Sequence, residues 1–213
     1  MDIHFKYDPV KEIETLKVAL GGSNNPSPTR FGLEAQELNI NFNYKDEVVA
    51  FVQSKLERQD IDIYNLCEQF STAWSPYKQT ASQTFSKTFE TGWDPGEFTA
   101  YLTLGQRCPY NFEGQYYFIS ATSRLLKPLA TSLHELQHFY SHAILKPLFE
   151  SDGVLEKFND FKEALTVILN IQFTEAIETE DKGYPQHKEL REWILKEFKR
   201  FYVLISTFPL HFL

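Results

Sequence analysis

Two histidines and a glutamate lie close together in the middle of the chain, in the segment His134-Glu135-Leu136-Gln137-His138. In an α-helix, residues four apart lie on one face about a turn apart, so His134 and His138 can direct both imidazole rings at one cation. Glu135 lies one position further round the helix, where its carboxylate would contact a water on the cation rather than the cation itself. The pattern therefore predicts a two-histidine metal site with a general base beside it.

The residues around this motif predict the helix that it requires. Pro128 suits the first turn of a helix. Apolar residues then recur at the spacing of a buried helix face. These apolar residues are Leu129, Leu133, Leu136 and Tyr140. The alternative interpretation is a core helix whose histidines make only hydrogen bonds.

The segment from His134 to His138 resembles the zinc-binding helix of the zincin metallopeptidases. Metzincins continue with a glycine and then a third histidine, but Ser141 and Ile144 occupy those two positions here. Gluzincins instead take a glutamate from a following helix, and the chain resembles this branch. On a continuous helix, His142 would lie about 6 Å further along the axis than His138, too far to complete a tetrahedral site.

Glu163 is the best candidate for the third ligand that this resemblance implies. Residues 154–174 have a helical pattern in which Glu163 belongs to a polar stripe beside an apolar one. A carboxylate in a largely apolar helix needs a partner, and zinc is a suitable one. The segment Glu163-Ala164-Leu165-Thr166 also resembles the sequence around the gluzincin ligand. Asp160 is the alternative ligand, and a solvated acidic face is the alternative to any ligand here.

Tyr184 and His187 follow the third ligand, in the part of the chain from which gluzincins commonly supply a donor to the oxyanion of the reaction. The resemblance implies that Tyr184 or His187 has this role, and a surface tyrosine with a helix cap is the alternative. Arg191 could orient a carboxylate of a substrate or hold a structural acid such as Asp181.

The strongest strand patterns precede the motif helix. Residues 98–104 and 115–120 are rich in β-branched and aromatic residues. In zincins an edge strand beside the motif helix pairs with an extended substrate, and either segment could be that strand. Residues 38–42 could add a short strand, and residues 44–58 and those from 61 onward have helical spacing.

The predicted fold class is α+β: a mainly helical, zincin-like domain with a small mixed β-sheet before the metal-binding helix. Residues 1–28 are interpreted as a helical segment followed by a Gly/Ser/Asn/Pro linker. Residues 29–213 are predicted to form a single catalytic domain. Its sheet and motif helix extend to about residue 147, and residues 148–213 form a helical C-terminal part.

Charge and hydropathy restrict the partners and the location that we expect. A net charge of -8 argues against nucleic acid and against an anionic membrane surface, because both attract basic patches. No run of 18 apolar residues and no signal-peptide pattern is found, so we expect a soluble, cytoplasmic protein with no membrane partner. Cys67 and Cys108 match no metal-binding cysteine pair and are expected to be reduced thiols.

Together these observations predict a zinc-dependent metallopeptidase. By the resemblance, Zn²⁺ would be held by His134, His138 and Glu163, and Glu135 would act as the general base toward a zinc-activated water that attacks a peptide bond. The partner would then be a peptide or protein substrate. Two alternatives stay open: a catalytically inactive zincin-like protein that binds metal or peptide, and a structural or regulatory helical protein.

Overall fold

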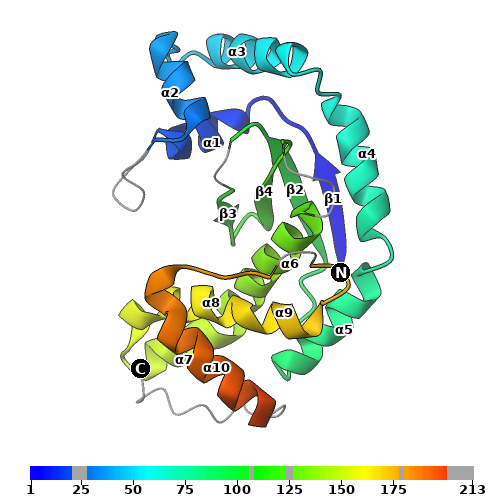
Figure 1. Ribbon diagram of the computed structural model, residues 1–213, viewed down its shortest axis with the longest axis vertical. Helices are drawn as coiled ribbons and strands as arrows, with labels where there is room; N and C mark the ends of the chain where they lie inside the picture. Colours follow the sequence, from blue (N-terminus) through cyan, green and yellow to red (C-terminus); the bar gives the residue numbers. More distant parts are fainter. Residues whose placement is uncertain (21–27, 106–107, 123–126, 178–179, 201–213) are drawn as a thin grey trace. The chain divides into compact units, whose positions relative to one another are not determined.

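The chain folds into two compact units, which Figure 1 shows as a ribbon. The computed structural model describes residues 1–20, 28–105, 108–122, 127–177 and 180–200. Unit 1 contains residues 76–95 and the chain from Leu129 onward, and unit 2 contains residues 2–75 and 96–128. Most of the predicted linker, residues 21–27, lies outside the described residues.

Unit 2 contains a four-stranded mixed sheet with the strand order β1-β2-β4-β3. β1 and β4 both pair in parallel with β2, and β3 pairs antiparallel with β4. The α+β prediction, with a small mixed sheet that precedes the motif helix in sequence, is therefore confirmed. The strands are β1 (Asp2–Lys6), β2 (Glu97–Thr103), β3 (Tyr110–Asn111) and β4 (Tyr116–Ser120).

The strand β1 occupies the start of residues 1–28, which were interpreted as a helical segment followed by a linker. Ile3 and Phe5 point to the buried face of the sheet, where they are paired in register with Phe98 and Ala100. Two alternating apolar residues are too weak a signal to predict a strand alone, because the pairing partner lies far away in sequence. Only the second part of the segment, α1 (Glu12–Ala19), is helical.

Four helices of unit 2 are described: α1, α2 (Arg30–Glu37), α3 (Lys45–Arg58) and α4 (Ile63–Trp74). α4 runs alongside β1, where the rings of Phe70 and Phe5 meet edge to face at 6.0 Å (Figure 1). The predicted helices after residues 44 and 61 are confirmed. The predicted short strand at 38–42 is wrong, because Leu38 caps α2 and Asn39 adopts a φ of 54°.

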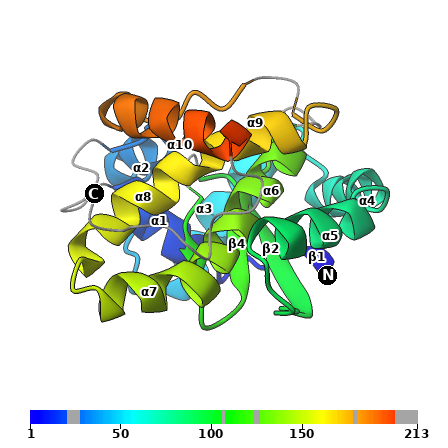
Figure 2. The same cartoon turned by 90° about the horizontal axis from the view of Figure 1, so that it is seen from below.

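The described residues of unit 1 form helices joined by turns and loops, with no strand among them. α10 packs along α8, as Figure 2 shows. No helix among the described residues is both long enough and apolar enough to span a membrane. The helical segments are α5 (Lys78–Thr88), α6 (Lys127–Tyr140), the π-helix η1 (Ser141–Leu145), α7 (Lys146–Ser151), η2 (Leu155–Lys157), α8 (Phe158–Leu165), η3 (Thr166–Ile168), α9 (Leu169–Gln172), η4 (Pro185–His187) and α10 (Lys188–Arg200).

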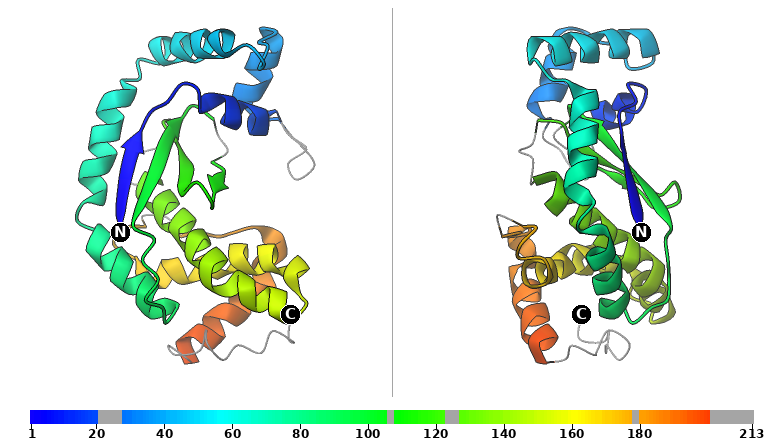
Figure 3. Two further views of the ribbon diagram at one scale, coloured as in Figure 1. Left: turned by 180° about the vertical axis from the view of Figure 1, so that it is seen from behind. Right: turned by 90° about the vertical axis from the view of Figure 1, so that its right-hand side faces the viewer.

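An aromatic cluster fixes the end of α6 in unit 1. The ring of Tyr140 stacks on Phe85 at 5.1 Å and on Phe89 at 5.4 Å, and meets Trp93 edge to face at 4.8 Å. α5 accordingly lies beside α6, which can be followed by their colours in Figure 3. Aromatic pairs at these distances contribute about 0.5–1.5 kcal/mol each beyond their burial, so the cluster holds the helix that carries both histidines.

The helix predicted over residues 154–174 lies where it was expected, but it is not one continuous α-helix. A 3-10 turn precedes α8, and a second one separates α8 from α9. Gly153 adopts a φ of +70° just before this segment, a conformation that favours glycine and ends the preceding helix. Glu163 lies in the second turn of α8, whose apolar face includes Phe158, Phe161 and Leu165.

Candidate metal centre

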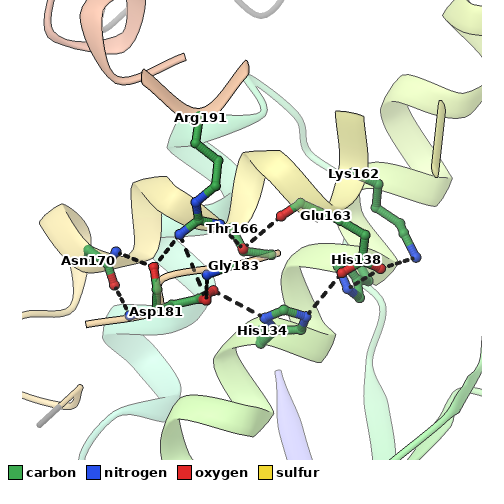
Figure 4. A network of polar contacts seen from close by, with 9 residues as sticks. All are labelled: His134, His138, Lys162, Glu163, Thr166, Asn170, Asp181, Gly183 and Arg191. Atoms are coloured by element: carbon green, nitrogen blue, oxygen red, sulfur yellow. Dashed lines mark hydrogen bonds and ion pairs between the residues drawn. The ribbon is translucent and has the colours of Figure 1, made fainter. Parts of the chain in front are cut away.

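The structure brings His134, His138 and Glu163 together in unit 1, with one ligand atom of each within 4.8 Å of the others (Figure 4). Nε2 of His138 lies 3.3 Å from Oε1 of Glu163, and Nε2 of His134 lies 3.8 Å from Oε2. The two imidazole rings have centroids 4.4 Å apart. The two histidines therefore share one face of α6, and α8 places Glu163 opposite them.

Both of these nitrogen–oxygen separations are close to those between ligand atoms in a tetrahedral zinc site. Ligand atoms about 2.0–2.2 Å from zinc and at tetrahedral angles lie roughly 3.3–3.6 Å apart. The His138–Glu163 distance has this value, and the His134–Glu163 distance, measured to the other carboxylate oxygen, is slightly longer. Two imidazoles and one carboxylate are also the ligand set of catalytic zinc sites that keep a fourth position open.

Asp160 and His142 do not belong to this group of side chains. Asp160, the alternative third ligand, lies near the start of α8, where Oδ1 is 3.0 Å from Nε2 of His187. His142 lies in the π-helix η1, and its ring meets that of Phe158 edge to face at 4.9 Å. Among the described residues, the acid that joins the two histidines is therefore Glu163.

The charges of two of the three residues suit metal ligation. Burial lowers the pKa of His138 to about 3, so its imidazole is neutral near pH 7, as a ligand must be. Burial alone would raise the pKa of Glu163, but the hydrogen bond with His138 and the charge of Lys162 outweigh it. The pKa of Glu163 is thus held well below its usual range, and the carboxylate is ionised.

His134 lies between two carboxylates, as Figure 4 shows. Nε2 faces Glu163, whereas Nδ1 lies 3.5 Å from Oδ2 of Asp181. Burial opposes protonation of His134, but Asp181, Glu135 and Glu163 outweigh it and raise the pKa of the ring. Metal binding through Nε2 would replace the proton there, while the contact of Nδ1 with Asp181 can persist.

Glu135 directly follows the first histidine in sequence, and its carboxylate is buried and within electrostatic influence of His134, Lys162 and Glu163. It is 7% exposed, and its Oε2 has no hydrogen-bond partner among the described residues. Burial raises the pKa of Glu135 to about 7. A carboxylate with a pKa near neutrality and a free oxygen can accept a proton from water and return it, which is the chemistry of a general base.

Lys162 is a component of the site that the sequence analysis missed. Its side chain is buried, and Nζ lies 3.1 Å from Oε1 of Glu163. A lysine next to an acid in a helix is common on protein surfaces, so no sequence pattern distinguishes a buried ammonium group. The charge helps to lower the pKa values of His138 and Glu163.

Asp181 is the second component that lacked a clear sequence signal, apart from its possible pairing with Arg191. Its backbone amide donates to Oδ1 of Asn170, and Nδ2 of Asn170 donates to its carbonyl, both at 2.9 Å. The amide of Gly183 donates to Oδ1 of Asp181 at 2.8 Å. A polar residue of α9 therefore holds the loop that presents Asp181 to His134. Of the two roles predicted for Arg191, the structure shows the contact with Asp181.

Tyr184 directly precedes η4 and His187 is the last residue of η4, and both lie outside the group of three candidate ligands. His187 is buried and contacts Asp160, whereas Tyr184 is 55% exposed. Their rings meet edge to face at 5.8 Å. The role of either residue as an oxyanion donor stays a prediction.

Comparison of the chain with protein-family models, with curated proteins and with solved structures gave no match. The geometry of the site and the resemblance of its motif are therefore the grounds for a function.

Proposed function

We propose that this protein is a zinc-dependent hydrolase that cleaves peptide bonds. The observation that carries the proposal is the convergence of His134, His138 and Glu163, with two residues from α6 and one from α8. The three side chains come from sequence positions that resemble the gluzincin pattern, and one ligand atom of each lies within 4.8 Å of the others. A buried general-base candidate, Glu135, lies directly after the first histidine.

A bound Zn²⁺ would supply a Lewis acid, which lowers the pKa of water and polarises a carbonyl group. Glu135 has the role of the proton carrier. It accepts one proton as a water oxygen bonds to the carbonyl carbon, and it delivers that proton to the amine nitrogen as the carbon–nitrogen bond breaks. The products are a carboxylic acid and an amine, so water is the sole co-reactant.

A peptide is proposed as the substrate because of the motif's resemblance to the zincins, since the same site chemistry would serve other carbonyl groups. The net charge of -8 supports a peptide or protein rather than a nucleic acid as the partner. Tyr184 or His187 would donate to the oxyanion, which needs a hydrogen-bond donor in the transition state.

Metal binding without turnover is the second candidate function. Glu135 is almost fully buried, and the ammonium group of Lys162 lies against the third ligand. Both features would suit a site that holds a cation without admitting a substrate. The Glu135→Gln variant, discussed below, distinguishes this function from catalysis.

Metal content tests the proposal directly. The purified wild type, reconstituted with Zn²⁺ and dialysed, should contain about one zinc per chain by elemental analysis. Glu163→Ala should lose the zinc, because two imidazoles alone bind it weakly. Asp160→Ala is the matched control: it removes an acid from the same helix but should keep the zinc. Zinc retained in Glu163→Ala, or absent from the wild type, would contradict the proposed site.

A further inference from the structure

Arg191 is a buried cation of unit 1 that lies outside the group of candidate ligands. It is on α10 and only 5% exposed. A guanidinium group withdrawn from water must recover its lost hydrogen bonds from the protein, and its planar fork can bind two partners at once. The identity of these partners shows what the buried charge does.

The first partner connects Arg191 to the helix that carries the third ligand. Nη1 donates to Oγ1 of Thr166 at 2.9 Å, and this hydroxyl donates to the backbone carbonyl of Glu163 at 2.9 Å. Thr166 is fully buried at the end of α8. One arm of the guanidinium group is therefore attached to the turn that follows Glu163 (Figure 4).

The second partner connects Arg191 to the first ligand. Nη2 donates to the backbone carbonyl of Asp181 and lies 3.8 Å from Oδ1 of its carboxylate. The other carboxylate oxygen, Oδ2, faces Nδ1 of His134. The guanidinium group thus lies between the loop that contacts His134 and the helix that presents Glu163.

The loop is fitted closely around this side chain. Gly183 has a φ of +61°, and a Cβ atom there would lie 2.6 Å from Nη1 of Arg191 and 2.9 Å from Cδ. Such distances exclude a side chain at position 183 unless Arg191 moves. Asn170 holds the same loop through both of its amide atoms, so Asp181 has little freedom to move away from His134.

We propose that Arg191 is a positioning residue of the metal centre, which sets the placement of His134 relative to Glu163 by binding Asp181 and Thr166 at the same time. This inference rests on the proposed metal site. Acceptors that bind the second nitrogen of a ligating histidine fix the ring, and their loss typically costs about 10–100-fold in metal affinity. Arg191 acts one step further out, through the residue that makes this contact.

The test is a double-mutant cycle read as zinc affinity. Zinc affinity is measured by competition with a chromophoric chelator for the wild type, Arg191→Met, Asp181→Asn and the double variant. Each single substitution should weaken zinc binding by about 10–100-fold. If Arg191 acts through Asp181, the loss in the double variant should be clearly smaller than the product of the two single losses.

A matched control separates positioning from a general loss of positive charge. Lys188→Met removes one cation from the first turn of the same helix, where the side chain is 78% exposed, and it should change the affinity by less than about twofold. Far-UV circular dichroism of the metal-free variants reports whether the fold is kept. Absorption spectra with Co²⁺ in place of zinc report the ligand geometry and should change for Arg191→Met but not for Lys188→Met.

Wild-type zinc affinity in Arg191→Met, or losses that simply multiply in the double variant, would overturn the inference and leave the proposed function intact. A wild type that binds no zinc would overturn both. If Arg191→Met does not fold, Arg191→Lys keeps the charge but cannot bind two partners through a planar fork. It should fold with weakened zinc binding, and wild-type affinity in Arg191→Lys would equally contradict the inference.

Discussion

Glu135 and Glu163 are two carboxylates whose surroundings shift their pKa values in opposite directions. Burial raises the pKa of Glu135 to about 7, whereas His138 and Lys162 outweigh burial at Glu163 and lower it. Opposite shifts in neighbouring acids separate their roles, because one can exchange a proton near neutral pH and the other stays ionised. Glu135 is thereby suited to proton transfer and Glu163 to ligation.

At this scale we predict that Glu135→Gln removes turnover but not zinc. Loss of a general base should slow hydrolysis of a mixture of peptides by about 10²–10⁴-fold, because the amide of glutamine cannot accept the proton. Peptide products are measured by mass spectrometry, and zinc by elemental analysis. Glu175→Gln, an exposed acid of unit 1, is the control and should keep both.

Full activity in Glu135→Gln would exclude Glu135 from the mechanism. A wild type that contains zinc but cleaves no peptide would instead favour metal binding without turnover.

The residues that could be predicted from the sequence are those with a periodic or motif signal. His134 and His138 are four apart on one helix, and Glu163 belongs to the polar stripe of the next helix. Lys162 and Asp181 could not be predicted in this way. Their roles depend on burial and on tertiary contacts with Glu163 and His134, which no local pattern encodes.

Among the elements, α1 and β2 of unit 2 are connected by a buried acid. Glu12, in the first turn of α1, is 1% exposed and accepts hydrogen bonds from the amide of Leu104 at 2.9 Å and from the hydroxyl groups of Thr15 and Thr103. Burial raises the pKa of Glu12, although these hydrogen bonds oppose the shift. The connection therefore has a pH-dependent strength.

We predict that the stabilisation by Glu12 decreases as pH rises. Its pKa is higher in the folded than in the unfolded protein. Its contribution is therefore complete below the ordinary value of 4.5 and is lost as pH rises through the raised pKa. The unfolding free energy of wild type minus that of Glu12→Gln, from urea titrations between about pH 4 and about pH 8, should decrease with pH.

Glu57→Gln, at an exposed position of α3, provides the reference and should give a nearly constant difference. A difference for Glu12→Gln that increases with pH would mean that the hydrogen bonds outweigh burial.

Helices and strands with a strong periodicity of apolar residues could be predicted, whereas a strand that depends on pairing with a distant strand could not. The helices of residues 44–74 and the strands β2 and β4 follow local patterns, but β1 requires β2, which comes about ninety residues later. The π-helix η1, which follows the motif helix directly, was not predicted either. Short π-helices next to α-helices are frequent at functional sites, yet they have no simple sequence signature.

At the scale of the whole molecule, the candidate ligands and their supporting residues all belong to unit 1. The chain contributes to this unit in two separate stretches, residues 76–95 and the part from Leu129 onward. Composition does not reveal such an arrangement, because the two stretches are joined in space rather than in sequence. The predicted single domain over residues 29–213 stays a prediction.

We predict that zinc slows amide hydrogen exchange in unit 1 only. A ligand that binds the folded protein suppresses openings that break its site, so amides of α6, α8 and the loop 180–183 should become more protected. Amides of β2 and β4 that exchange through local opening should be unchanged. Exchange with and without Zn²⁺ is followed by mass spectrometry, and Mg²⁺, which prefers oxygen ligands, serves as the control.

Protection that increased in the sheet of unit 2 but not in unit 1 would contradict this assignment of the site.

The packing of Tyr140 against the ring of Phe85 on α5 shows that the candidate metal centre depends on residues outside the stretch that carries its ligands. The candidate ligands and all of their proposed supporting residues lie between Leu129 and Arg200, in one contiguous stretch of sequence. That stretch lacks Phe85, Phe89 and Trp93, which cover the end of the motif helix. A fragment or a gene fusion that starts at Leu129 would thus carry every candidate ligand but leave the aromatic ring of Tyr140 without these three contacts.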